Sequence, residues 1–344
     1  MKSFDFLQPR SVDEAISTWT ADAAYLGGGT NLLDLMKIGV AQPTTVIDLS
    51  RIPGLDAIDH QAGGGVRIGA MVRNADLVWD ADVVADFPMV AEAILSGASG
   101  QLRNAATVGG NLMQQTRCAY FQDSFSACNR REPGAGCAAK GGVDGAMAVL
   151  GWTDDCIATN PSDFAVPLMA LDAVVEVQGP NGKRELPLSH FYGDDAAVNN
   201  TLQEGELILA LRLPASARNF SSHARYVKLR ERTSFAFALV SAAAALRIEG
   251  GVIAEARLAL GAVAARPWRV AGAEELLKGR APTAEAFADA AARLLEGARP
   301  SGANGHKIEL ARRIAIRALT LAAAGTPVRI PALPASVVEE PFDA

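Results

Sequence analysis

The chain opens with short apolar runs that alternate with stretches of helical spacing. Ser11 is followed three residues later by Glu14, which is the spacing of a capping box and predicts a helix beginning at residue 12. Strands are expected at 23–26, 45–49 and 66–70, and further helices at 31–38, 74–79 and 89–96. The first part of the chain is therefore expected to consist of small α/β units.

This regular pattern stops after residue 111. Residues 113–147 are rich in Gly, Cys, Gln and Arg and show no sustained period. An irregular segment of this length inside a compact domain is uncommon and is usually functional. Regular patterning returns with a predicted helix at 163–171 and strands at 173–177 and 207–213.

Small and polar residues at 215–222 mark a predicted domain boundary. Beyond it, strands are expected at 224–230, 239–248 and 256–263, and helices at 271–277, 284–296 and 307–324. Strands and helices do not alternate strictly, so the fold class predicted is α+β. We expect one domain over 1–218, a second over 219–330 and an extended tail over 331–344.

Composition excludes several classes of protein. The chain has 344 residues, 49% of them hydrophobic, which excludes a disordered chain. Its formal net charge of −6 and the lack of a basic cluster argue against a nucleic-acid partner. The longest uncharged stretch near the apolar peak, 233–246, is shorter than a membrane-spanning helix. Residues 1–7 contain charged and polar positions and do not form a signal peptide.

A glycine-rich segment, 26–31, lies between a predicted strand and a predicted helix. Glycines allow close backbone approach, and the start of a helix attracts anions, so a diphosphate is the expected ligand. No Gly-Lys-Ser/Thr follows, which excludes a P-loop, and Leu32 occupies the place of the third glycine of a dinucleotide fingerprint. A second segment, Thr107 to Asn111, contains Gly109 and Gly110. Each segment alone is equally compatible with a tight turn, but together they favour a large polar ligand.

Four cysteines lie within the irregular segment and just after it, and the rest of the chain has none; they are Cys118, Cys128, Cys137 and Cys156. Four thiolates are the ligand set of a [4Fe–4S] cluster. Basic residues beside them would offset the negative charge of a cluster: Arg117, Arg130, Arg131 and Lys140. Structural zinc usually uses short C-x2–4-C pairs, which this sequence lacks, and a chain with a large core has little need of disulfides. Zinc, two disulfides and free thiols stay open as alternatives.

The ordered set of segments at 27–31, 107–111 and 162–163 resembles the FAD-binding medium subunit of the molybdenum hydroxylases, the xanthine dehydrogenase and carbon monoxide dehydrogenase family. The resemblance covers the chain from residue 4 to about 329. The stretch at 228–236, together with the cysteine insertion, is most similar to the flavin subunit of periplasmic-type aldehyde oxidoreductases. Some family members with such an insertion carry a [4Fe–4S] cluster, so the resemblance favours that reading.

The resemblance implies a fold and a set of FAD contacts. The fold would be an FAD domain of the vanillyl-alcohol-oxidase and cell-wall-reductase type, with two α/β subdomains, followed by a smaller α+β domain. The implied FAD contacts are Tyr25, Leu26, Gly27, Gly28, Gly29, Thr30, Asn31, Ala106, Thr107, Gly109, Gly110, Asn111, Ser162, Asp163, Leu209 and Lys228. Lys228 would stabilise the reduced flavin electrostatically, or it would be a surface strand residue.

The resemblance also implies an electron-transferring role. Electrons would come from a large subunit with the molybdenum cofactor through a small [2Fe–2S] subunit, and would leave through FAD to an external acceptor. No catalytic residue is expected here, because the four histidines have no metal-ligand spacing and the cofactors carry the chemistry. A free-standing FAD oxidase and a zinc- or disulfide-stapled scaffold without redox activity are the alternatives. We expect a cytoplasmic protein, or a periplasmic one exported with a signal-bearing partner.

Overall fold

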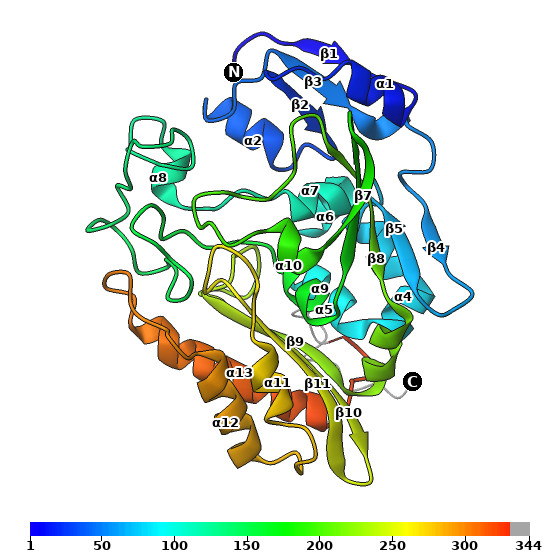
Figure 1. Cartoon of the computed structure of the whole chain (residues 1–344), viewed down its shortest axis with the longest axis vertical. Helices are drawn as coiled ribbons and strands as arrows, with labels where there is room; N and C mark the ends of the chain where they lie inside the picture. Colours follow the sequence, from blue (N-terminus) through cyan, green and yellow to red (C-terminus); the bar gives the residue numbers. More distant parts are fainter. Residues whose placement is uncertain (331–344) are drawn as a thin grey trace, which may run out of the picture.

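The computed structural model describes residues 1–330, and the expected tail over 331–344 lies outside these residues. Three sheets follow one another from the N-terminal end of the molecule to the opposite end (Figure 1). The predicted mixture of helices and strands is confirmed.

The first sheet is small and parallel, with strand order β1-β3-β2. Its elements are β1 (Asp5–Leu7), α1 (Val12–Ser17), β2 (Ala23–Leu26), α2 (Leu32–Lys37) and β3 (Thr45–Asp48). The Ser11 hydroxyl accepts a hydrogen bond from the Glu14 N–H at 3.1 Å, as predicted, and so begins α1. The Glu14 carboxylate reaches the N–H of Arg10 at 2.8 Å, one residue before the cap, so the capping box is shifted by one position.

The second sheet is antiparallel, with strand order β4-β5-β8-β6-β7. Its strands are β4 (Ile58–His60), β5 (Val66–Gly69), β6 (Val174–Gly179), β7 (Gly182–Pro187) and β8 (Leu207–Leu213). The helices of this part are α3 (Asn74–Trp79), α4 (Ala81–Asp86), α5 (Pro88–Ser96), α6 (Gly100–Ala105), α7 (Val108–Leu112), α9 (Ala165–Ala170) and α10 (Leu188–Phe191). The pairing of β5 with β8 brings the two ends of this part of the chain together.

The third sheet is also antiparallel, with strand order β12-β11-β10-β9. Its elements are β9 (Ala224–Leu229), β10 (Val240–Glu249), β11 (Val252–Gly261), β12 (Trp268–Arg269), α11 (Ala271–Glu275), α12 (Ala284–Leu294) and α13 (His306–Ala323). A 3-10 segment, η2 (Ala215–His223), connects it to the second sheet.

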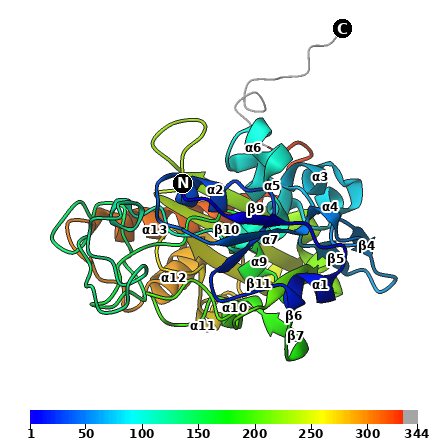
Figure 2. The same ribbon diagram turned by 90° about the horizontal axis from the view of Figure 1, so that it is seen from above.

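Helices cover both faces of the third sheet, and the sequence of β10 explains this arrangement. Ala242 and Ala244 belong to the core cluster that contains α12 and α13, whereas Ala243 and Ala245 belong to the cluster that contains α5 and α9. Alternate residues of a strand face opposite sides, so these alanines let helices approach closely on each side. Figures 1 and 2 show α13 and α12 on the outer side of this sheet.

A buried ion pair fastens the third sheet to the second part of the fold. Arg225 on β9 donates to the Glu92 carboxylate on α5 at 3.0 Å, and both side chains are largely buried. The same carboxylate accepts the backbone N–H of Tyr226 at 2.7 Å. The Glu92 carboxylate thus accepts from both the guanidinium and a backbone N–H, and such additional hydrogen bonds offset the cost of burying an ion pair.

The irregular segment runs from residue 113 to 164 and contains one short helix, α8 (Ala119–Gln122). Both views place it at one side of the molecule, beside α13 (Figures 1 and 2). The Lys307 ammonium, which is fully buried, donates to three carbonyls, those of Ala146, Met147 and Ala262, at 2.7–2.9 Å. Burial lowers the pKa of Lys307 to about 8. This lysine therefore fixes residues 146–147 of the irregular segment to the third part of the fold.

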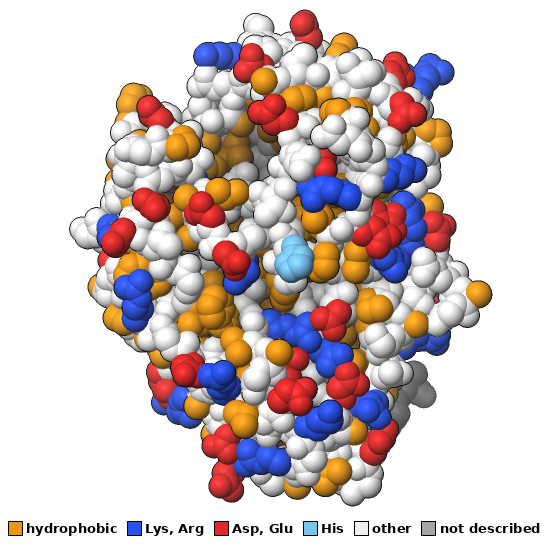
Figure 3. Space-filling view, in the orientation of Figure 1, with side chains coloured by type: hydrophobic (Ala, Val, Ile, Leu, Met, Phe, Trp, Pro, Cys, Tyr) orange, Lys and Arg blue, Asp and Glu red, His pale blue; other side chains and the backbone are white. Residues whose placement is uncertain are grey.

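The long helices and central strands were predicted to within a few residues, and β8 at its observed limits. The prediction missed several short elements: β1, β4, β7, β12, α4, α6, α7, α8 and α10. Among the described residues, no helix is long and apolar enough to cross a membrane. Figure 3 shows acidic and basic side chains interspersed over one face of the molecule.

Candidate functional site

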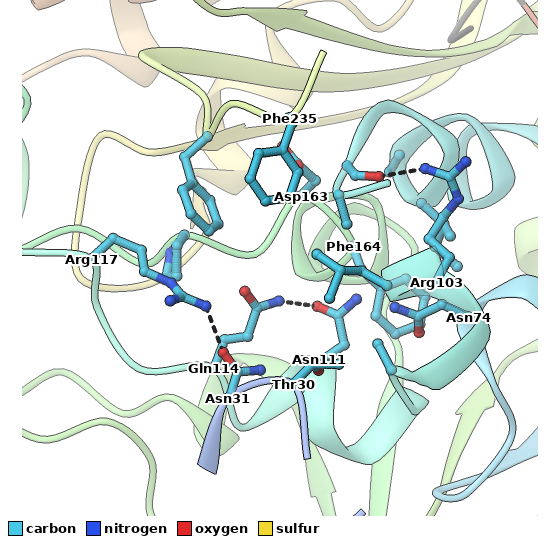
Figure 4. Close-up of a pocket in the computed structure, with 18 of the residues that line it drawn as sticks. Thr30, Asn31, Asn74, Arg103, Asn111, Gln114, Arg117, Asp163, Phe164 and Phe235 are labelled. Atoms are coloured by element: carbon cyan, nitrogen blue, oxygen red, sulfur yellow. Dashed lines mark hydrogen bonds between the residues drawn. The ribbon is translucent and has the colours of Figure 1, made fainter. Parts of the chain in front are cut away.

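A cleft lies where the glycine-rich loops, the end of the irregular segment and the third sheet meet. It is lined by polar and charged side chains from all of these segments, among them Thr30, Asn31, Asn111 and Asp163 (Figure 4). Lys228 lines it too. These five were predicted as site residues, and the structure brings them together. Ala106, also predicted, completes this group.

The first glycine loop, between β2 and α2, makes very close contact with the loop that ends α6. A Cβ atom on Gly28 would lie 1.8 Å from the Ala105 carbonyl oxygen, and one on Gly27 would lie 2.6 Å from the Thr107 hydroxyl. Gly29 has φ +75°, a conformation that other residues rarely adopt. These glycines let the backbones of the two loops pack in direct contact, so the packing itself requires glycine at these positions. Whether the same glycines also approach a ligand stays a prediction.

The second glycine segment forms the short helix α7, which Thr107 caps through a hydrogen bond from the Gly110 N–H at 3.3 Å. A Cβ atom on Gly109 would lie 3.0 Å from the Ala70 side chain, so this glycine also permits close packing. The Asn31 side-chain amide donates to the Gly110 carbonyl at 3.4 Å. The two predicted loops therefore form one continuous wall of the cleft.

Asn111 and Ser162 stand at the two ends of the irregular segment, and a hydrogen bond joins them. The Ser162 hydroxyl donates to the Asn111 side-chain oxygen at 2.8 Å, and the Gln114 amide donates to the same oxygen at 2.5 Å. Ser162 also accepts the N–H of Ala165 at 3.1 Å, at the beginning of α9. The irregular segment is thus a long loop whose two ends are joined by a hydrogen bond at the cleft.

Asp163 and Lys228 form an ion pair on the cleft wall, 2.7 Å from carboxylate oxygen to Nζ. Their side chains are 9% and 4% exposed, so the reading of Lys228 as a surface residue is wrong. The Tyr226 hydroxyl donates to the other carboxylate oxygen at 2.6 Å, and burial, together with this carboxylate, raises the pKa of Tyr226. Asp163 balances the charge of Lys228, so the lysine presents a paired charge to the cleft.

The side chains of Tyr25 and Leu209 lie away from the cleft. Both belong to the apolar cluster beneath the first sheet, and the Tyr25 hydroxyl donates to the Gly205 carbonyl at 2.9 Å. Burial raises the pKa of Tyr25 to about 12. Leu26 ends β2 in the same region.

The irregular segment gathers its four cysteines around one small pocket. Cys118 and Cys156 are buried, Cys128 and Cys137 are half-buried, and all four are free thiols. Cys128 and Cys137 face each other across a short antiparallel bridge. Burial raises the pKa of the Cys118 thiol, and the nearby Cys128 and Cys137 act in the same direction, while backbone N–H groups of Phe121 and Tyr120 oppose the rise.

The irregular segment has an apolar core of its own. It buries a cluster that includes Phe121, Ala139, Met147, Ile157 and Ala158 beside the cysteines. The neighbouring basic residues were predicted to offset the negative charge of a cluster, and this stays a prediction. In the structure Arg131 donates to the Phe121 carbonyl at 2.7 Å, Arg130 donates to the Ala196 carbonyl at 2.7 Å, and Lys140 pairs with Asp154. Arg131 and Lys140 bond oxygens of the loop itself, and Arg130 bonds the loop to the carbonyl of residue 196, so these cations hold the shape and position of the loop.

Comparison with known proteins assigns the chain to a family. Residues 2–216 match the family described as the FAD-binding domain in molybdopterin dehydrogenase, and residues 225–326 match the CO dehydrogenase flavoprotein C-terminal domain. This chain belongs to the FAD-binding subunits of the molybdenum hydroxylases. It is 43% identical to the aldehyde oxidoreductase FAD-binding subunit PaoB of Escherichia coli, over 91% of this chain and 96% of that one.

A further relative extends the likeness to a solved structure. The carbon monoxide dehydrogenase medium chain of Hydrogenophaga pseudoflava is 30% identical over 93% of this chain and 96% of that one. A solved structure of that organism's carbon monoxide dehydrogenase aligns with a TM-score of 0.74 over 94% of this chain and 98% of that one. The resemblance predicted from the sequence is confirmed at the level of the family. The comparisons support FAD for this FAD-binding subunit and do not support an iron–sulfur cluster in it.

The cleft contains unpaired hydrogen-bonding groups that FAD could satisfy. Within residues 1–330, the buried Oδ1 of Asn74 and the buried Nε of Arg117 have no hydrogen-bond partner. Both side chains line the cleft, at opposite ends of it (Figure 4). Buried polar groups in native proteins are almost always paired, and FAD carries both hydroxyl donors and anionic oxygens that could satisfy them.

Sequence reasoning did not assign these two residues to the cofactor, nor Arg103, Phe235 and Phe237, which also line the cleft. Asn74 opens a helix beside the second glycine segment, and its backbone N–H binds the Ala106 carbonyl at 2.8 Å. Only the fold brings it there. Arg117 directly precedes the first cysteine, and this position singled it out as a candidate site residue. Sequence reasoning, however, assigned its charge to the thiols and not to FAD.

We predict that Gly28→Ala lowers both the FAD content and the melting temperature of the protein. The added methyl group would overlap the Ala105 carbonyl oxygen and separate the two loops. Gly63→Ala is the matched control, because a Cβ there meets no atom within 4 Å. Flavin absorbance per chain and thermal melting are the measurements. A Gly28→Ala protein with the melting temperature and flavin content of the control would contradict this account of the loops.

Proposed function

We propose that this chain is the electron-transferring FAD subunit of a molybdenum-dependent aldehyde oxidoreductase. One observation carries the choice of aldehydes: the similarity to the aldehyde oxidoreductase subunit reaches 43% identity over nearly the whole of both chains, against 30% for the carbon monoxide dehydrogenase chain. The cleft described above is where FAD would bind.

In this proposal each group of residues at the cleft has a role. The two glycine segments, with the helix starts of α2 and α7, would hold the diphosphate through backbone N–H groups. Ser162, Asp163 and Lys228 would hold hydroxyl and carbonyl groups of the cofactor, and Tyr25 and Leu209 would support the loops from the apolar cluster behind them. FAD, when bound, accepts two electrons and releases them one or two at a time.

The proposed partners are a small [2Fe–2S] subunit and a large subunit with the molybdenum cofactor, where the aldehyde would react. An external acceptor would take the electrons from the flavin. In this proposal the compartment follows the partners: it is the cytoplasm, or the periplasm if a partner carries the export signal.

A free-standing FAD oxidase is the weaker candidate. Such an enzyme needs an acid, a base or a covalent attachment residue above the flavin ring. Among the described residues that line the cleft, none is a histidine or a cysteine. The ionisable pair at Asp163 and Lys228 is already engaged in a buried ion pair.

We also propose the finer fold of the resemblance. The N-terminal domain would be of the vanillyl-alcohol-oxidase and cell-wall-reductase type, its two subdomains centred on the first and second sheets. The boundary would fall near residue 218, within η2, and residues 219–330 would form the C-terminal domain. The separate family matches over 2–216 and 225–326 support this division.

We further propose that the four cysteines bind a [4Fe–4S] cluster. This proposal rests on the cysteine arrangement and not on the comparisons. A zinc ion with four thiolates at 2.3 Å would bring the sulfurs to about 3.8 Å from one another. Within the described part of the chain, no three cysteine sulfurs lie within 4.8 Å of one another. A cubane cluster binds each thiolate through a different iron, which suits the wider spacing.

We predict that the chain, coexpressed with the small and large subunits, forms a complex in which aldehyde reduces the flavin. In the isolated chain, aldehyde should leave the flavin oxidised, because the substrate reacts at molybdenum in another subunit. Stopped-flow absorbance of the flavin, in the complex and in the isolated chain, is the measurement. Flavin reduction by aldehyde in the isolated chain would contradict the proposal and favour the oxidase.

We predict that the isolated chain, purified without oxygen, contains about four iron atoms. Replacing any one of Cys118, Cys128, Cys137 and Cys156 by Ser should lower the iron content severalfold, whereas the exposed Ser124→Ala in the same loop should not. Hydrogen exchange should rise over residues 113–157 in the cysteine variants, because metal binding stabilises the folded loop. Elemental analysis is the first measurement. Stoichiometric zinc, or no metal and two disulfides, would contradict the proposal.

A further inference from the structure

Arg117 connects the cysteine loop to the FAD cleft. It is the residue directly before Cys118, and it leaves the loop toward the cleft, where its Nη2 donates to the Asn31 side-chain oxygen at 2.8 Å (Figure 4). Asn31 in turn donates to the Gly110 carbonyl. One chain of hydrogen bonds therefore runs from the residue beside a cysteine through both glycine segments.

The guanidinium group of Arg117 is held in place on two sides. Besides the bond to Asn31, it lies over the ring of Phe237, 4.9 Å from guanidinium carbon to ring centroid. Phe237 belongs to the loop between β9 and β10, so a residue of the third sheet's loop also restrains the arginine. An arginine fixed in this way loses little side-chain conformational entropy when it binds a ligand.

One donor of this fixed group is unused. The Nε of Arg117 is buried and has no hydrogen-bond partner in the part of the chain that the structure describes. Burial lowers the pKa of Arg117, and the nearby Asp34 opposes that shift, yet a guanidinium stays charged at neutral pH. A buried, charged donor without an acceptor costs free energy until a ligand supplies an oxygen.

We propose that Arg117 is a positioning residue for FAD, which donates through Nε to an oxygen of the bound cofactor while its Nη2 holds Asn31, and so couples the cysteine loop to the flavin site. The proposal rests on the FAD-binding role proposed above. Coupling between two sites is reciprocal, so FAD should stabilise the cysteine loop as much as the ordered loop favours FAD.

The test compares three variants of the coexpressed complex. Arg117→Met removes the charge and the hydrogen bonds, Arg117→Lys keeps the charge without the planar group, and Lys37→Met removes an exposed charge from α2 as the matched control. FAD is removed and titrated back, and its dissociation constant is measured by fluorescence. Hydrogen exchange over residues 113–120 is measured with and without FAD.

Arg117→Met should weaken FAD binding by about tenfold or more, which corresponds to the loss of one charge-assisted hydrogen bond. Arg117→Lys should fall between Arg117→Met and wild type, and Lys37→Met should bind FAD as wild type does. FAD should protect residues 113–120 in wild type and in the control but not in either Arg117 variant.

Two outcomes would overturn the inference. One is wild-type FAD affinity in Arg117→Met; the other is undiminished protection of 113–120 by FAD in Arg117→Lys, a variant that keeps the charge and so tests the bond itself. Either result, with FAD bound normally by wild type, leaves the proposed function standing. Failure of wild type to bind FAD at all would instead overturn the proposed function.

Discussion

The ion pair between Asp163 and Lys228 is the contact on which the geometry of the cleft depends. Asp163 lies at the end of the irregular segment, and Lys228 lies on β9 of the third sheet, so the pair joins two parts of the fold. A buried pair is costly to desolvate and persists only where its remaining bonds are satisfied. Here Tyr226 donates to the second carboxylate oxygen, and the Ser96 carbonyl lies 3.3 Å from the lysine nitrogen. Together with the Glu92–Arg225 pair, the Asp163–Lys228 pair fixes β9 as a wall of the cleft.

Two further contacts explain why a long irregular loop can lie beside the cleft without opening it. The hydrogen bond from Ser162 to Asn111 joins the two ends of the loop, and Lys307 on α13 binds the loop at residues 146–147. The cysteines are thereby held in a loop whose two ends meet at the cleft. If they bind the proposed cluster, this arrangement would keep it at a constant distance from the proposed FAD site.

The sequence predicted much of this fold because the long elements have strong periodicity. The buried strand over 207–213 and the amphipathic helices near 284 and 307 were found within a few residues. The short elements β1 and β4 were missed because three residues carry too little pattern. The ordered glycine segments predicted the cleft, but the roles of Gly28, Asn74 and Arg117 follow from contacts between distant residues. Nothing in a local pattern shows that Gly28 meets Ala105, or that Asn74 and Arg117 keep unpaired atoms.

The measurement that tests the central claim most directly is the FAD dissociation constant in Asp163→Asn, Lys228→Met and the double variant. If the pair holds the two walls of the cleft together, each single change should weaken FAD binding about tenfold or more. The double change should weaken it by less than the product of the two, because no unpaired buried charge is left. FAD affinities that stay at the wild-type value in both single variants, or effects that simply multiply in the double variant, would contradict the account.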